Sequence, residues 1–226
     1  MTPFVSTLWP ATGPAPAPEW EVTTANSFVD TLETTHTFTL PADRKANDFV
    51  IINVRLGTSG PTLAAITGWT VNAISSVAGY AYQITRVLDG SEGATVTATS
   101  SEATRFTSLA VKVRGAAVTV TPFFEYQDGA SLTPPTLAPT WGVAAETLFV
   151  NVLSAKTADW VAEPPSGYGA HVVSPGAGTS QSTRARIEKA HRVATIASES
   201  PGAWTLTTLG SFTNARNSLM GLRKAA

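Results

Sequence analysis

Short apolar runs separated by turn residues recur along the chain from Val22 onward. Thr35–Leu40 alternates polar and apolar side chains, which is typical of a strand with one buried face. Phe49–Val54 is almost continuously apolar and β-branched, as expected of a central strand. The same reasoning predicts further strands at Gly68–Ile74, Tyr80–Leu88, Ala94–Thr99 and Ser108–Arg114. Short strands at this spacing predict an all-β fold, either a sandwich or a barrel.

The landmarks of the first half return in the same order roughly a hundred residues later. Glu146–Val152 resembles Asp48–Val54, with an asparagine before the last valine in both. Two further matches are Ser166–Tyr168 with Thr67–Trp69, and Ser218–Arg223 with Ser108–Arg114, while Glu199–Leu206 follows Glu92–Thr97 with a small insertion. We interpret this as an internal duplication. It predicts two related antiparallel β-sandwich halves, jelly-roll or immunoglobulin-like, over residues 22–121 and 122–226.

The repeat decides how one ambiguous segment is interpreted. Arg184–Val193 is rich in residues that favour helices, and taken alone it could form a helix. In the duplicated order it occupies the place of Tyr80–Val87, which has a clear strand pattern. We therefore predict a strand here, with a helix as the alternative.

Residues 1–21 form a separate segment at the N-terminus. Thr12–Pro18 is a Pro-Ala run, and proline fixes φ and lacks an N–H donor, so an extended arm is expected. The arm also carries large apolar side chains, at Phe4, Leu8, Trp9 and Trp20. It either packs on its own domain or serves as an assembly arm that docks on a neighbouring subunit.

Composition narrows the classes of function. Among 226 residues only 14% are charged, and the formal net charge is -1, so no strong field would attract nucleic acid. The N-terminus lacks the basic start and apolar core of a secretory signal, and no segment reaches the length of a membrane-spanning helix. We expect a chain made in the cytoplasm without a signal peptide, with neither nucleic acid as a partner nor insertion into a membrane.

Residues that could carry catalysis are sparse and scattered. There is no Gly-x-Ser-x-Gly elbow, no cysteine, and no ligand spacing among His36, His171 and His191. Asp89–Glu92 is an acidic segment with the composition of a turn that closes a strand. We therefore expect a protein that is not an enzyme, without catalytic residues, bound metal or cofactor.

Aromatic and basic residues supply the candidates for contact with a partner. Trp69 and Trp204 lie in strand patterns and are expected in the core. Asp159 and Trp160, close to Tyr168, could stack and hydrogen-bond a sugar ring, or could simply pack a loop. A second candidate is a basic strand that either faces solvent or meets an acidic neighbour in an assembly, formed by Arg184, Arg186, Lys189 and Arg192.

The order of these segments resembles a β-sandwich module of tailed-phage virion proteins and of some large secreted surface proteins. The matching residues run from Asn47–Ile52 and Thr67–Thr70 through Tyr82–Glu92 and Thr95–Thr97 to Val113–Gly115, with Pro122–Phe123 soon after. The second half departs from this pattern, with Tyr168 in place of the tryptophan and Arg223–Lys224 in place of Arg-Gly. The resemblance implies a building block for a virion or for adhesion, and it carries over no catalytic residues.

These observations lead to the expectation of a structural virion protein of a tailed bacteriophage. It would decorate the head or attach at the head spike or tail through its N-terminal arm. Its partners would be capsid or tail subunits and further copies of itself within the particle. The alternative is a carbohydrate-binding adhesion or receptor-binding module that contacts a host surface glycan.

Overall fold

The structure is a computed structural model of the whole chain. It describes residues 19–57, 60–74, 81–117, 123–129, 132–156, 161–177, 185–207 and 213–226. Six of the candidate arm and contact residues lie outside these ranges: Phe4, Leu8, Trp9, Asp159, Trp160 and Arg184.

Strands make up the regular structure of the described residues. The first half contains β1 (Glu21–Thr39), β2 (Phe49–Leu56), β3 (Thr70–Ala73), β4 (Ala81–Val87) and β5 (Thr95–Arg114). The second contains β6 (Phe123–Gly129), β7 (Thr147–Lys156), β8 (Ala162–Glu163), β9 (Gly169–Ala177), β10 (Ala185–Ala194), β11 (Thr205–Leu206) and β12 (Thr213–Arg223). Apart from a 3-10 turn at Gly142–Ala144, the described ranges contain no helix.

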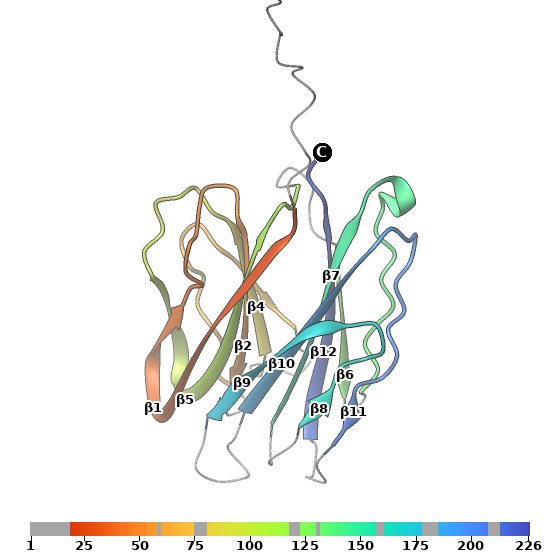
Figure 1. Cartoon of the computed structure of the whole chain (residues 1–226). Coiled ribbons are helices and arrows are strands. Elements are labelled where there is room, and N and C mark those ends of the chain that lie inside the picture. The colour runs from red at the N-terminus through yellow and green to blue at the C-terminus, as the bar shows by residue number, and fades with distance from the viewer. Residues whose placement is uncertain are drawn as a thin grey trace, which may run out of the picture.

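Each half of the chain builds one five-stranded antiparallel sheet, and the two sheets have the same strand order. The first sheet runs β1-β5-β2-β4-β3 and the second β6-β12-β7-β10-β9. The second order follows from the first when each strand is replaced by its counterpart in the repeat. The sheets stand side by side along most of their length (Figure 1), and β8 pairs with β11 in a small separate ribbon.

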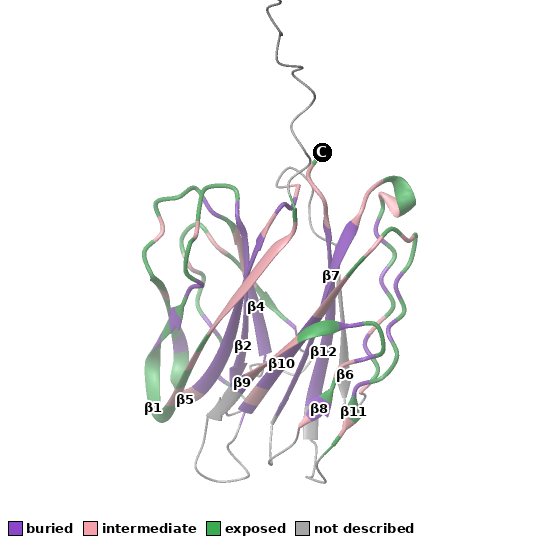
Figure 2. Cartoon of the chain, in the orientation of Figure 1, coloured by how far each residue is buried: buried purple, intermediate pink, exposed green. Residues whose placement is uncertain are grey.

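The predicted all-β fold with antiparallel sheets is confirmed, but each half supplies one sheet of a shared sandwich and does not form a sandwich of its own. The shared core lies between the sheets, where Phe49, Ile51 and Val111 meet Val150 and Met220. A second apolar cluster covers the outer face of the first sheet, and a third covers the outer face of the second. Buried residues accordingly run along the central strands of both sheets (Figure 2). The halves thus meet through one sheet each, and their central strands are buried on both faces.

The segment with helix-forming composition is a strand, as the repeat predicted. It forms β10, which pairs with β7 on one side and β9 on the other. Position in the sheet therefore overrides local helix propensity.

The predicted strands at Ala94–Thr99 and Ser108–Arg114 are wrong as separate elements, because both belong to β5. In the connecting stretch, Thr104, Phe106 and Thr107 pair with β1, and the register shifts between Val29 and Glu33 and again between Glu33 and Thr35. Side chains of Ser101–Ala103 are exposed, so no alternation of buried and exposed positions marks the strand here. The same reason explains why β1 extends well beyond the predicted Thr35–Leu40.

The proposed match between the two asparagines is wrong by one residue. Asn53 shares the inner face of β2 with Ile51, whereas Asn151 lies on the outer face of β7 and accepts a hydrogen bond from Trp204 Nε1 at 3.4 Å. Successive side chains on a strand point to opposite faces, so a slip of one residue exchanges core faces. The structural counterpart of Val50 is Phe149, and both belong to outer clusters.

Candidate functional site

A corner built from glycine, an aromatic ring, arginine and glutamate occurs on the outer face of the first sheet. Gly68 turns the chain with φ +77° directly before Trp69. The backbone N–H of Trp69 donates to Ile66 O at 3.0 Å. The Arg86 guanidinium carbon lies 5.8 Å from the centre of the Trp69 ring. This is a cation–π distance, and it places the charge of Arg86 over the indole.

The acidic turn after β4 holds Arg86 from its other side. Arg86 Nη2 lies 2.6 Å from Asp89 Oδ2, and Arg86 Nε lies 3.0 Å from Glu92 Oε1. The Glu92 carboxylate also accepts the backbone N–H groups of Asp89 and Gly90 at 2.9 and 3.0 Å. Hydrogen bonds from Ser91, first from its hydroxyl and then from its backbone, lower the pKa of Asp89. The predicted turn is therefore also the ion-pairing partner of the corner.

A pocket of about 250 Å³ opens beside this corner. Its apolar lining comes from Leu40, Trp69 and Val96, and the remainder of its lining comes from Arg86, Ser91, Glu92, Gly93 and Thr95. Trp69, which was expected in the core, is partly buried against the outer cluster of the first sheet, and it lines this pocket. The sequence pattern identified the tryptophan and the turn separately, and their contact through Arg86 was not predicted.

The second sheet carries a matching corner at Tyr168. Gly167 has φ +83°, and the Arg192 guanidinium carbon lies 5.6 Å from the centre of the Tyr168 ring. Arg192 forms an ion pair with Glu199, just as Arg86 does with Glu92. This corner is closed, because Tyr168 is 7% exposed and the Glu199 side chain 2%. Burial, reinforced by Glu199, raises the pKa of Tyr168, so its hydroxyl stays protonated.

The basic strand splits between the two faces of its sheet. Arg186 and Arg192 lie on the outer face, where Arg186 Nε is 2.8 Å from Glu188 Oε1. Lys189 lies on the inner face with Ile187 and is 1% exposed. The predicted cluster is therefore not one continuous basic surface among the described residues, and its two outer arginines already have carboxylate partners.

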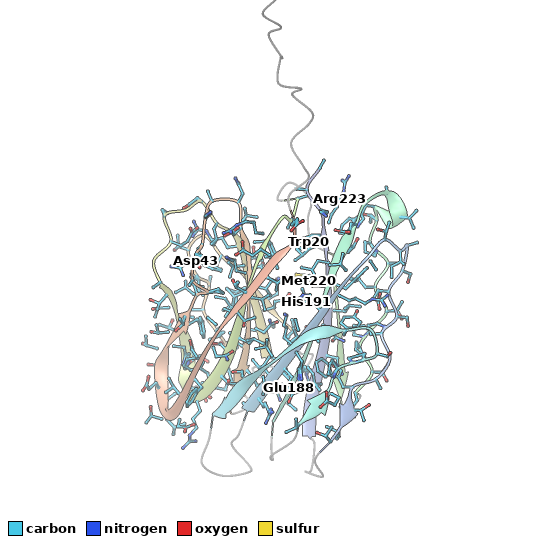
Figure 3. All side chains as sticks on the ribbon, in the orientation of Figure 1. Trp20, Asp43, Glu188, His191, Met220 and Arg223 are labelled. Atoms are coloured by element: carbon cyan, nitrogen blue, oxygen red, sulfur yellow. The ribbon has the colours of Figure 1, made fainter. Side chains whose placement is uncertain are left out.

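Glu188 is a fully buried carboxylate on the outer face of β10. It accepts hydrogen bonds from the backbone N–H of Ala162 at 3.3 Å and lies 2.9 Å from His171 Nε2. Burial raises the pKa of Glu188, while Arg186 and His171 oppose that shift. The group ties β8 and β9 to β10, and Figure 3 shows it near the end of the sandwich remote from the C-terminus.

Between the sheets, Lys189 Nζ lies 2.6 Å from His191 Nδ1. Burial lowers the pKa of Lys189 to about 8. Burial, followed by the charge of Lys189, lowers the pKa of His191 to about 4. The sequence gave no motif for the pair of Lys189 and His191. They lie at alternate positions of β10, and which face of β10 points inward is known only from the packing of the two sheets.

Trp20 fixes the start of β1 to both halves. Its Nε1 donates to Glu146 Oε1 at 2.6 Å, and its ring packs against the shared core. Glu146 Oε1 also lies 2.8 Å from Lys224 Nζ, near the C-terminus. Figure 3 places Trp20 near Arg223 at this end of the molecule. Of the four residues assigned to the arm, Trp20 is the one that the structure describes, and its contacts are within the chain.

The three histidines each contact a different partner. His36 Nε2 is 2.8 Å from Ser100 Oγ, whereas His171 contacts Glu188 and His191 contacts Lys189. Within the described ranges, no three His, Cys, Asp or Glu side chains gather where they could hold a metal ion. The same ranges contain no helix with the length and apolar character needed to cross a membrane.

Comparison with known protein families, with curated proteins and with solved structures gave no match to this chain.

Proposed function

We propose that the chain is a non-enzymatic structural protein of a tailed-phage particle, held in its assembly by the segment that precedes Trp20. The contacts of Trp20 carry this proposal. A residue at the base of the arm is tied to the shared core and, through Glu146, to the second half. Such an attachment would transmit force applied to the arm to both sheets and not to one edge strand alone.

The composition of the arm supports the same role. Phe4, Leu8 and Trp9 supply apolar side chains within a proline-rich segment. Proline limits the conformations that such a segment must lose when it binds, and aromatic side chains are common anchors of protein interfaces. The partners would be capsid or tail subunits and neighbouring copies of the chain.

Ion pairs near the ends of β1 and β5 would help these strands to resist force applied through the arm. Arg114 binds Asp48 through two hydrogen bonds of 2.8 Å and also pairs with Glu21. Lys112 Nζ lies 2.6 Å from Glu21 Oε1 and adds a second cation. Charged groups here connect β1, β5 and the turn before β2, so they support the framework at the base of the arm.

The test is incorporation into particles. A chain lacking residues 1–19 keeps Trp20 and every described strand, so it should fold with an unchanged circular dichroism spectrum. In cells that assemble the native particle, immunoblotting of purified particles should detect the full chain and lose the truncated one. Replacing Phe4, Leu8 and Trp9 with serine should cause the same loss while keeping the arm's length. Normal incorporation of either folded variant would remove the basis for an anchoring arm.

A further inference from the structure

We propose that the pocket beside Trp69 binds a single uncharged hexopyranose unit. This inference is independent of the assembly role proposed for the arm. Leu40, Trp69 and Val96 offer an apolar wall, and Arg86 and Ser91 bring polar atoms to the same pocket. A pyranose ring presents C–H groups on one face and hydroxyls around its edge, so it matches a pocket with both kinds of lining.

The charges around the pocket favour a neutral ligand. Arg86 is already paired with both Asp89 and Glu92, so these three groups together carry a formal charge of one negative unit. An acidic sugar would meet that excess negative charge and would have to compete for a guanidinium that is already engaged. A hydroxyl can instead donate to a carboxylate oxygen or accept from the guanidinium without separating the ion pairs.

The polar groups are held in place before any ligand arrives. Ser91 Oγ donates to Asp89 Oδ1 at 2.5 Å, which leaves the hydroxyl oxygen able to accept a further hydrogen bond. Glu92 is fixed by two backbone N–H groups of its own turn. Side chains that are already ordered lose little entropy when a ligand binds.

The size of the pocket restricts the ligand to one ring. Its volume of about 250 Å³ lies just below the range of about 300–1,000 Å³ found for pockets that hold drug-sized molecules. One sugar unit at the end of a glycan would enter, while the remainder of the glycan would stay in solvent. Low affinity for a monosaccharide is therefore expected.

The matching corner of the second sheet supplies an internal comparison. Tyr168 and Glu199 are almost fully buried there, so the pair leaves little surface for a ligand. In the first corner Trp69 is partly exposed. The arginines do not make this difference, because the Arg86 side chain is 21% exposed and the Arg192 side chain 31%. The open copy therefore differs from the closed copy in access, although both contain the same ion pair.

Gly93 offers a position at which the pocket can be blocked, and Gly202 offers a matched control outside it. Gly93 lines the pocket, and a Cβ built there would meet only Thr95 O, at 4.0 Å. Gly202 follows Glu199 in the second half, and a Cβ there meets no atom within 4 Å. Gly93→Phe is the blocking variant, Gly202→Phe is the matched control, and Gly93→Ala controls for the loss of glycine alone.

Binding is measured on the full chain by titrating methyl glycosides of glucose, galactose, mannose and N-acetylglucosamine to tens of millimolar, because weak binding is expected. The readout is the indole N–H resonance of Trp69, assigned through Trp69→Phe. At least one glycoside should shift it saturably. Gly93→Phe should weaken that binding about tenfold or more, a loss of about 1.4 kcal/mol, while Gly93→Ala and Gly202→Phe should bind as the parent does.

Three outcomes would overturn the proposal. The first is that no glycoside shifts the Trp69 resonance saturably. The second is that Gly93→Phe, shown to be folded by its amide spectrum, binds as tightly as Gly202→Phe. The third is that N-acetylneuraminic acid, which carries a carboxylate, binds as tightly as the neutral sugars. None of these results depends on whether the arm enters a particle.

Discussion

Arg86 and Arg192 occupy equivalent positions in the two sheets. Arg86 is the cross-strand neighbour of Val50, and Arg192 is the cross-strand neighbour of Phe149. Each arginine lies over the aromatic ring that follows a positive-φ glycine, and each binds a glutamate beyond the end of its own strand. The duplication is therefore preserved in a specific three-residue contact as well as in strand order.

The two arginines should differ in their effect on stability. Arg192→Met leaves the carboxylate of Glu199 buried without its cation, and we expect a loss of about 2–3 kcal/mol in the free energy of unfolding. Arg86→Met leaves Asp89 exposed to water and Glu92 held by backbone N–H groups, so about 1 kcal/mol is expected. Urea unfolding followed by fluorescence measures both values. The double variant Arg192→Met/Glu199→Gln should recover part of the loss, and equal losses for the two arginines would contradict this account.

Stability should depend on pH through His191. Its pKa in the folded chain is about 4 against an ordinary value of 6.5, so below pH 6.5 unfolding takes up a proton. This contribution to stability is complete above pH 6.5 and falls as the pH is lowered to about 4, by about 1–3 kcal/mol. His191→Gln should make the free energy of unfolding depend less on pH in this range. Subtracting the value for the variant from that for the parent at each pH removes the opposing contribution of Glu188, which both proteins share. Parallel pH curves for the two proteins would show that His191 does not titrate as described.

Sequence patterns located the central strands because burial leaves a clear mark there. Phe49–Val54 is apolar on both faces, and the structure buries it between the shared and outer clusters. The same patterns missed the middle of β5, where exposed residues on both faces resemble a loop. They also could not align the two halves to the exact residue, because Asn53 and Asn151 look equivalent until the sheet face that each one occupies is known.

The contacts of the corner at Trp69 were missed for a related reason. Asp89–Glu92 was predicted to be a turn, which agrees with the structure. Trp69 was predicted to be a core residue, but it is only partly buried against the outer cluster. Their meeting at Arg86 depends on the register between β3 and β4, which pairs Thr70 with Thr85. A glycine–aromatic pair followed by an arginine and a glutamate in both halves was the signal that could have revealed it.

Trp20 should stabilise the fold through its hydrogen bond as well as its ring. Trp20→Phe keeps most of the apolar contact but removes the donor to Glu146, so a loss of about 1 kcal/mol is expected. Trp20→Ala should cost more, about 2 kcal/mol, because the contact with the shared core is also lost. Glu146→Gln keeps an acceptor for the indole and should cost less than Trp20→Phe. Thermal unfolding of the three variants checks this order, and a neutral Trp20→Ala would show that the contact contributes nothing.

The shared core predicts that neither half folds alone. Separating the sheets would expose the inner face of β2 and β5 to water, including Phe49, Ile51, Leu109 and Val111. Each such side chain loses about 1.5–3 kcal/mol of burial, and a typical domain has a net stability of only about 5–15 kcal/mol. A chain of residues 19–117 should therefore aggregate or self-associate when produced alone.

The same argument predicts one cooperative transition for the full chain. Ile51→Ala, in the shared core, should lower the unfolding midpoint of both sheets together, and so should Val150→Ala from the opposite side. Fluorescence of Trp69 and of Trp204, each recorded in a variant in which the other five tryptophans are replaced with phenylalanine, reports each half separately. Coincident midpoints in parent and Ile51→Ala chains are expected. A monomeric, folded 19–117 fragment, or two separate midpoints in the full chain, would show instead that each sheet is stabilised by its own outer cluster.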